Sequence, residues 1–121
     1  MIRALLVDDH PGMRRAVRRL LERDGEVEVV GEVEDGEQAL LVLDRLMPDV
    51  MLLDVNMPHM DGFEVLQTLR KKARRTKVVV LTMYGSADVR ERALAAGAEA
   101  MVTKQRAYSE LLPAIREAVA A

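Results

Sequence analysis

The chain has no cysteine among its 121 residues. Disulfide bonds, thiolate catalysis and thiolate metal sites are therefore excluded, and the composition is compatible with a reducing compartment. Tryptophan is also absent, and the three aromatic residues are Phe63, Tyr84 and Tyr108. An aromatic platform that stacks single-stranded nucleic acid is therefore not expected, and the core must be built from aliphatic residues and methionine.

Long apolar runs are missing as well, and the longest is far too short to cross a bilayer. The first residues, Met1-Ile2-Arg3, lack the charged, apolar and cleavage regions of a signal peptide. Internal repeats, low-complexity tracts and flexible linkers are absent too. We therefore expect one soluble, cytoplasmic domain covering residues 1–121, with no contact with a membrane and no effector domain in this chain.

Charge of one sign does not dominate, since 18 basic and 20 acidic residues leave a net charge of −2. The domain as a whole thus offers no electrostatic reason to bind DNA. One basic cluster occupies residues 70–75, with Lys77 just beyond it. We interpret this cluster as the solvated carboxyl end of a helix, where cations are favourable.

Short apolar runs rich in valine and leucine alternate with stretches of helical periodicity, five of each. This alternation is typical of an α/β fold, in which helices connect the strands of a parallel sheet. Several runs are almost continuously apolar, as strands buried on both faces require. The expected strands cover residues 3–7, 27–33, 50–54, 77–82 and 100–103.

Helix starts are marked by capping patterns. Asp35 is followed three residues later by Gln38, and Asp61 by Glu64, so each pair can satisfy free amides at the start of a helix. The remaining helices are expected from Pro11 to before Gly25, from Ser86 to Gly97, and from about Ser109 to the C-terminus, where Pro113 would bend the helix or delay its start.

Chemically useful residues stand at the carboxyl ends of four of the five expected strands: Asp8 and Asp9, Asp54, Thr82, and Lys104. Side chains at the carboxyl ends of parallel strands converge on one edge of the sheet. One aspartate at such a place can simply cap the next helix, but clustered carboxylates repel one another unless a cation neutralises them. Magnesium prefers oxygen ligands and accepts phosphate oxygens, so the set predicts a Mg2+ site for phosphoryl transfer.

These residues belong to longer segments with a recognisable pattern. The segments are Leu5-Leu6-Val7-Asp8-Asp9-His10, residues 48–58 (PDVMLLDVNMP), Met60-Asp61-Gly62, Val80-Leu81-Thr82-Met83, and Gly97-Ala98 with Lys104. Over essentially its whole length the chain resembles the receiver domains of two-component response regulators. Asp-Asp-His and Thr-Met-Tyr are most similar to the LuxR-type subfamily, which carries a C-terminal helix-turn-helix DNA-binding domain.

The resemblance implies a flavodoxin-like, doubly wound sheet of five parallel strands in the order 2-1-3-4-5, with five helices. It also implies that Asp54 accepts a phosphoryl group from a sensor histidine kinase. Lys104 would pair with a phosphate oxygen, and the Thr82 hydroxyl would move in to bond another. The protein would then be a switch that dimerises on phosphorylation, through a face that the sequence does not identify, and not an enzyme in the usual sense.

The same resemblance implies a metal site. Mg2+ would be bound directly by Asp9, by Asp54 and by the main-chain carbonyl of Asn56, and through a water molecule by Asp8. Any contact with DNA would pass through an effector domain outside this chain, giving a role in transcription.

Some residues depart from the family pattern, and others are expected to affect the lifetime of the acyl phosphate. Met101 stands where an aromatic switch residue is usual, so an aromatic rotamer switch is not expected there. Gln105 replaces the proline or aspartate that commonly follows the lysine. Asn56 and Tyr84 are expected at the mouth of the pocket, where they would shield an acyl phosphate from water. The two histidines, His10 and His59, are interpreted as surface residues and not as metal ligands.

Three other functions fit parts of the pattern. A Mg2+-dependent small-molecule phosphohydrolase would use Asp54 as nucleophile, but such enzymes carry a second aspartate where this chain has Asn56. An adaptor of receiver fold would work without phosphorylation, yet all five pocket residues are present. A flavin-binding protein would need a phosphate loop after the first strand, where Asp8 and Asp9 would repel phosphate.

Overall fold

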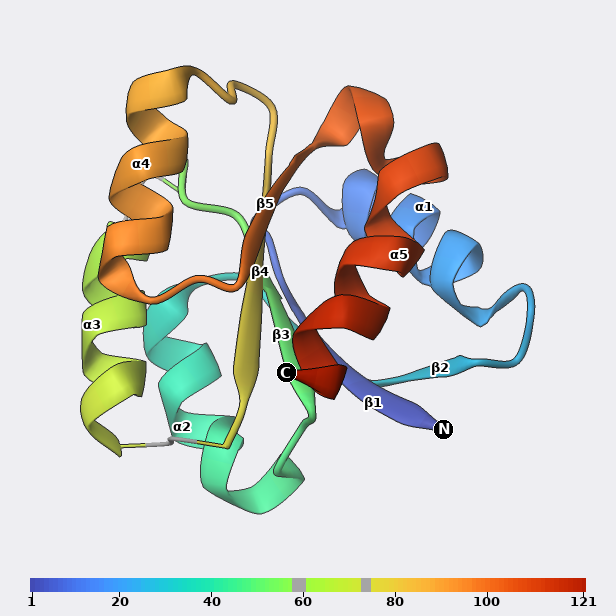
Figure 1. Ribbon diagram of the computed structural model, residues 1–121. Coiled ribbons are helices and arrows are strands. Elements are labelled where there is room, and N and C mark those ends of the chain that lie inside the picture. Colours follow the sequence, from blue (N-terminus) through green and yellow to red (C-terminus); the bar gives the residue numbers. More distant parts are fainter. Residues whose placement is uncertain (58–60, 73–74) are drawn as a thin grey trace.

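A parallel sheet runs through the centre of the molecule (Figure 1). The structure is a computed structural model that describes residues 1–57, 61–72 and 75–121. Its strands are β1 (Ile2–Val7), β2 (Val27–Val33), β3 (Val50–Leu53), β4 (Lys77–Thr82) and β5 (Ala100–Thr103). All neighbours pair in parallel, in the order β2-β1-β3-β4-β5. The expected flavodoxin-like fold and strand order are confirmed.

Helices cover both faces of the sheet (Figure 1). On one face lie α1 (Pro11–Glu22) and α5 (Ala107–Ala120), and on the other lie α2 (Gly36–Leu46), α3 (Gly62–Lys72) and α4 (Ala87–Ala96). Alternate residues of a strand point to opposite faces, so the two layers need different residues of β1. Leu5 and Val7 pack against the layer of α2, α3 and α4, and Ala4 and Leu6 against that of α1 and α5.

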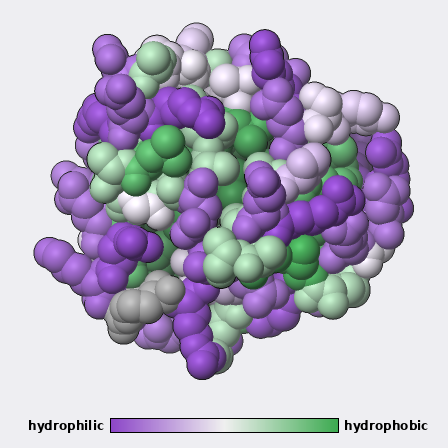
Figure 2. Space-filling view, in the orientation of Figure 1, coloured by the Kyte–Doolittle hydropathy of each residue, from purple (hydrophilic) through white to green (hydrophobic). Residues whose placement is uncertain are grey.

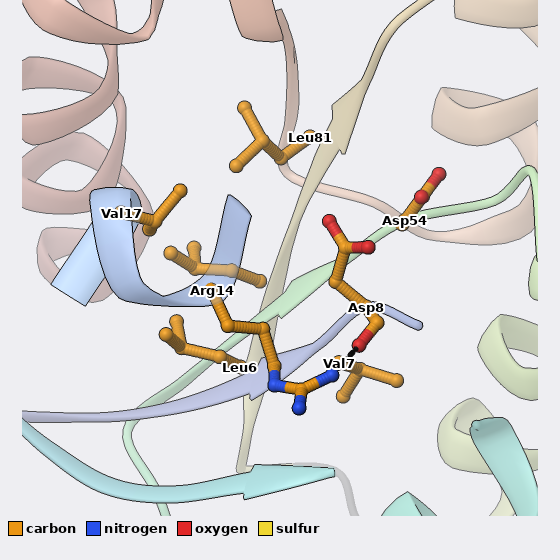
Figure 3. A pocket seen from close by; sticks show the side chains of 8 residues that line it. Leu6, Val7, Asp8, Arg14, Val17, Asp54 and Leu81 are labelled. Carbon is orange, nitrogen blue, oxygen red and sulfur yellow. Dashed lines mark hydrogen bonds between the residues drawn. The ribbon is translucent and has the colours of Figure 1, made fainter. Parts of the chain in front are cut away.

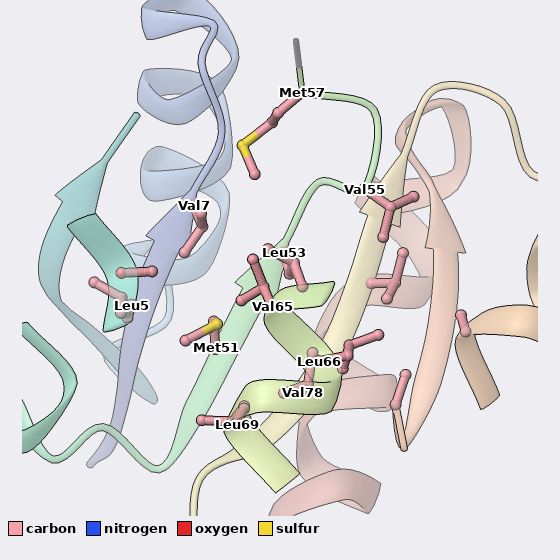
Figure 4. Close-up of a cluster of buried hydrophobic side chains, with 14 of the residues drawn as sticks. Leu5, Val7, Met51, Leu53, Val55, Met57, Val65, Leu66, Leu69 and Val78 are labelled. Atoms are coloured by element: carbon pink, nitrogen blue, oxygen red, sulfur yellow. The ribbon is translucent and has the colours of Figure 1, made fainter. Parts of the chain in front are cut away.

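Both layers are closely packed and aliphatic. Leu66 and Leu69 of α3 belong to the same buried cluster as Met51 and Leu53 of β3 (Figure 4). Complete burial of one such side chain contributes about 1.5–3 kcal/mol of transfer free energy. The central strands are therefore held rigidly, and the residues that follow them start from fixed positions.

Capping sets most helix boundaries where the sequence predicts them. The Asp35 carboxylate accepts a hydrogen bond of 2.8 Å from the amide of Gln38 at the start of α2. Ser86 caps α4 in the same way through the amide of Val89, and Gly97 ends that helix with φ +113°. Asp61 also caps α3, but its carboxylate accepts from the amide of Phe63 at 2.9 Å and not from Glu64.

The last helix begins slightly earlier than expected. A 3-10 turn, η1 (Lys104–Arg106), leads directly into α5 at Ala107, two residues before the expected start at Ser109. Ala107 is buried against the sheet, so packing extends the helix toward β5. Pro113 consequently lies in the second turn, where it leaves the carbonyl four residues earlier without an amide partner, and it does not delay the start of α5.

Within the described residues, no helix is long and apolar enough to cross a membrane. Hydrophilic residues cover most of the face in Figure 2, and apolar side chains show in separate small areas between them. The predicted turn at Pro58, His59 and Met60, and residues 73–74 of the basic cluster, lie outside the described residues.

Candidate functional site at the carboxyl edge of the sheet

The structure brings the predicted strand-end residues to one edge of the sheet. Asp8 and Asp9 follow β1, Asp54 follows β3, Thr82 is the last residue of β4, and Lys104 is the first residue after β5. The ladder continues past the strands, since the amide of Asp8 donates to the Val33 carbonyl at 3.1 Å and that of Asp54 to the Val7 carbonyl at 3.0 Å. Because their main chain is fixed in this way, the aspartates point into a common pocket.

Lys104 bridges two of the carboxylates. Its Nζ atom lies 2.8 Å from Oδ2 of Asp8 and 3.2 Å from Oδ2 of Asp54. The side chains of the three residues are at most 9% exposed. Burial of the ammonium group acts to lower the pKa of Lys104, but the hydrogen bond to Asp8 and the charges of Asp54 and Asp8 outweigh it and raise that pKa. Lys104 therefore stays charged and compensates part of the negative charge.

Asp9 lies on the open side of the same cluster, with its side chain 26% exposed. Its Oδ1 atom is buried and accepts no hydrogen bond from the described residues. The Nδ1 atom of His10 lies only 3.0 Å away, but that contact meets the distance for an ion pair and not the geometry of a hydrogen bond. A buried carboxylate oxygen with no donor is unfavourable unless a cation satisfies it.

Ligand atoms of Asp8, Asp9, His10 and Asp54 all lie within 4.8 Å of one another. Three of these residues offer carboxylate oxygens, the ligand type that Mg2+ prefers, and Oδ1 of Asp9 has no hydrogen-bond donor among the described residues. The donor set therefore fits a Mg2+ ion. His10 was expected to be a surface residue, and its side chain is 67% exposed. Its Nδ1 atom also lies 3.2 Å from Oδ1 of Asp8, where the ring nitrogen can donate to the carboxylate when it carries a proton.

Thr82 and Asn56 form a second part of the site. Thr82 is fully buried, and its hydroxyl accepts a hydrogen bond of 2.6 Å from the side-chain amide of Asn56. The main-chain amide of Asn56 donates to Oδ1 of Asp54 at 2.9 Å. Asn56 thus contacts both the hydroxyl and the central carboxylate, while the ring of Tyr84, two residues after Thr82, is 74% exposed.

Met101 is buried beneath the loop that joins β4 to α4. A Cβ atom on Gly85 would lie 2.6 Å from Cγ2 of Thr103 and 3.0 Å from Cε of Met101, so this loop packs closely on β5. Gln105 supports the same loop, since its side-chain amide donates to the main-chain carbonyl of Met83 at 3.3 Å. Met101 and Gln105, the two residues that depart from the family pattern, therefore both contact the loop after Thr82.

Sequence reasoning missed one contact with the acidic pair. The guanidinium group of Arg14 donates a hydrogen bond to the main-chain carbonyl of Asp8 (Figure 3). Helical periodicity places Arg14 near the start of α1, but it does not say that the side chain turns back toward β1.

The structure also explains why a glycine occupies position 62. A Cβ atom there would lie 2.5 Å from Cα of Val55, the residue directly after Asp54.

Known proteins resemble the chain over almost its whole length. The sequence profile of the response regulator receiver domain matches residues 4–116. The nitrate/nitrite response regulator NarL of Escherichia coli K12 is 38% identical over 116 residues, which are 96% of this chain and 54% of NarL. The transcriptional regulatory protein LiaR of Bacillus subtilis is 36% identical over 118 residues, which are 98% of this chain and 56% of LiaR. The chain thus spans about half the length of these relatives.

Solved structures give the same result. The signal receiver domain of NarL from Mycobacterium tuberculosis superimposes with a TM-score of 0.92 at 34% identity, covering 99% of this chain and 97% of that one. The response regulator domain of CheB from Thermotoga maritima gives a TM-score of 0.90 at 32% identity, covering 100% and 98%. In sequence and in fold, the chain belongs to the response regulator receiver domains, among relatives of the NarL and LiaR type.

Proposed function

We propose that Asp54 is the phosphoryl acceptor of a phosphorylation-controlled switch. The observation that carries the proposal is the contact of Lys104 with Asp54 at 3.2 Å, inside a pocket that also holds the acidic pair Asp8 and Asp9. An ionised carboxylate can attack phosphorus without a general base. When the donor is a phosphohistidine, the P–N bond breaks as the bond from phosphorus to an Asp54 oxygen forms, and the imidazole takes up a proton.

The cation site supports this chemistry. Asp9, Asp54 and the main-chain carbonyl of Asn56 would hold Mg2+ directly, and Asp8 would hold it through a water molecule. When bound, Mg2+ neutralises negative charge on the transferring group. The buried oxygen of Asp9 that lacks a hydrogen-bond donor is the structural feature that favours such an ion.

Lys104 and Thr82 would recognise the product. Lys104 contacts Asp8 more closely than Asp54, so it can keep the Asp8 bond while it turns toward a phosphoryl oxygen. The Thr82 hydroxyl would bond a second oxygen after leaving the amide of Asn56. Because the loop after Thr82 packs on Met101 and Thr103, its movement would repack the surface formed by α4 and β5.

The partners follow from the relatives. A sensor histidine kinase would supply the phosphoryl group, and the output would be a DNA-binding domain, because the relatives include transcriptional regulators about twice as long as this chain. Phosphorylation would change the association of the receiver with that domain or with a second copy.

The decisive experiment uses acetyl phosphate and MgCl2 with detection by intact mass. We expect one added phosphoryl group on the original protein, none on Asp54→Asn, and the normal adduct on Asp44→Asn, an exposed aspartate on α2. Omission of Mg2+ should abolish the adduct. An adduct of equal yield on Asp54→Asn would contradict the assignment, and turnover of small phosphate esters would favour a hydrolase instead.

A further inference from the structure

Arg14 is a cation at the base of the acidic pocket that the proposed phosphorylation does not use. It lies in the first turn of α1, and its side chain is only 12% exposed. Together with Asp8 and Asp54 it lines a cavity between α1 and the sheet (Figure 3). By charge alone, a cation at this place would oppose the binding of a second cation.

The bond that Arg14 makes explains its presence. Its Nη1 atom donates to the carbonyl oxygen of Asp8. That carbonyl belongs to the planar peptide group that joins Asp8 to Asp9, so fixing the oxygen also fixes the direction in which the chain enters Asp9. Arg14 therefore acts on the position of Asp9 through the main chain.

Asp9 depends on this bond more than Asp8 does. The amide of Asp8 is held by Val33 and its carboxylate by Lys104. The buried oxygen of Asp9 accepts no hydrogen bond from the described part of the chain. Besides the contact of its Oδ1 atom with Nδ1 of the exposed His10 at 3.0 Å, support of the main chain before Asp9 is the restraint that the described residues provide for this ligand.

Arg14 is itself held in place. Its Nε atom donates to Oε1 of Glu32 at 3.3 Å, and Arg18 holds the other oxygen of Glu32 at 2.7 Å. Glu22 continues the network, because it accepts from Arg18 at 3.1 Å and from the amide of Val29 at 3.2 Å. The carboxylate of Glu32 also offsets the charge of Arg14 near the pocket.

We propose that Arg14 is a positioning residue for the divalent cation, which holds the Asp8–Asp9 peptide group so that Asp9 is presented to Mg2+, with Glu32 as its anchor. The inference deepens the proposed function, since it concerns the same cation site. The change in Mg2+ affinity that a positioning role predicts is opposite in sign to the change that the charge of Arg14 alone would cause. Loss of a positioning residue weakens Mg2+ binding, whereas loss of a nearby positive charge strengthens it.

The test measures the Mg2+ affinity of the protein by isothermal titration with MgCl2. Arg14→Met should raise Kd about tenfold, the lower end of the range for residues that orient metal ligands. Arg15→Met is the matched control, because it removes the same charge from an exposed position on the same helix, and its Kd should change by less than about twofold. An unchanged or lower Kd for Arg14→Met would overturn the inference.

Two further variants guard against simple loss of folding. Arg14→Lys keeps the charge and one donor but loses the fork that reaches Glu32, so it should recover part of the affinity. Glu32→Gln keeps an acceptor but weakens the anchor, and should raise Kd about threefold without unfolding the protein. A Glu32→Gln variant with the original affinity would contradict the role of this anchor.

The outcome is separable from that of the proposed function. If the original protein binds Mg2+ and is phosphorylated on Asp54, while Arg14→Met matches Arg15→Met, the inference fails and the function stands. If the original protein binds Mg2+ but accepts no phosphoryl group, the function fails, and the affinities of the variants still decide the role of Arg14.

Discussion

The side-chain amide of Asn56 donates a hydrogen bond of 2.6 Å to the hydroxyl of Thr82, joining the loop after β3 to the end of β4. The hydroxyl is fully buried, so the bond is shielded from water. In the proposed switch Thr82 has to leave this partner before it can bond a phosphoryl oxygen. The strength of the bond therefore sets part of the cost of activation.

A double-mutant cycle measures that strength. Asn56→Ala and Thr82→Val each remove one partner, and we expect a coupling free energy of about 1 kcal/mol between them in urea denaturation. The cycle needs all four proteins under the same conditions without Mg2+. Strictly additive effects would show that the bond contributes nothing to stability.

Lys104→Met should destabilise the protein near neutral pH. The change leaves the buried carboxylates of Asp8 and Asp54 without their shared cation, at a cost of about 3 kcal/mol. Saturating Mg2+ should restore part of the loss, because the ion replaces the missing charge. Lys77→Met is the control, since its ion pair with Glu99 is longer, at 4.0 Å, and less buried. Equal urea midpoints for the two variants would contradict the expectation.

Tyr84→Ala should shorten the lifetime of the phosphorylated protein. If the ring shields the acyl phosphate, its removal admits water and accelerates hydrolysis about threefold, or less than 1 kcal/mol in the barrier. The loss of the phosphoryl group is followed by intact mass after removal of acetyl phosphate. Tyr108→Ala is a close control, because both tyrosines are 74% exposed. An unaltered half-life would dispose of the shielding role.

Gly62→Ala should destabilise the domain and slow phosphorylation. Its new Cβ would lie 2.5 Å from the backbone of Val55, next to Asp54, and overpacking of this kind costs about 1–3 kcal/mol. Gly12→Ala provides the contrast, since its Cβ would meet nothing closer than 4.0 Å, and alanine favours the helix by about 0.5–1 kcal/mol. Thermal unfolding of the two variants should therefore shift in opposite directions.

Glu22 gives a prediction for pH. The hydrogen bond from the Val29 amide, together with Arg18, lowers the pKa of the Glu22 carboxyl below its ordinary value of 4.5. The contribution of the ionised Glu22 carboxylate to the free energy of unfolding is therefore complete above pH 4.5. That contribution is lost as the pH falls through the lowered pKa.

Glu22→Gln should then be less stable than the original protein at pH 7, by less than about 1 kcal/mol because the pair is exposed. The difference should shrink as the pH falls below 4.5. Urea denaturation at several pH values measures it, with Glu28→Gln, an exposed glutamate on β2, as the control. A difference that is independent of pH would contradict the role of the charge.

Much of the fold and of the site could be predicted because the information is local. Apolar runs indicate the buried strands, and Asp35, Ser86 and Gly97 mark helix ends by bonds to residues a few positions away. Once the strands are parallel, Asp8, Asp54 and Lys104 lie at the same edge of the sheet, since each directly follows a strand. Helix α5 was placed less well, because burial of Ala107 against the sheet extends it.

The amino-acid sequence alone therefore indicates which strands are buried, and which acids, hydroxyl and ammonium group stand at the carboxyl edge of the sheet. Which of their atoms are in contact depends on the three-dimensional packing. The bonds of Asn56 to Thr82 and of Arg14 to the Asp8 carbonyl depend on how side chains turn and how segments pack. Periodicity specifies the face of an element on which a side chain begins, whereas its partner is set by neighbours that are distant in the chain.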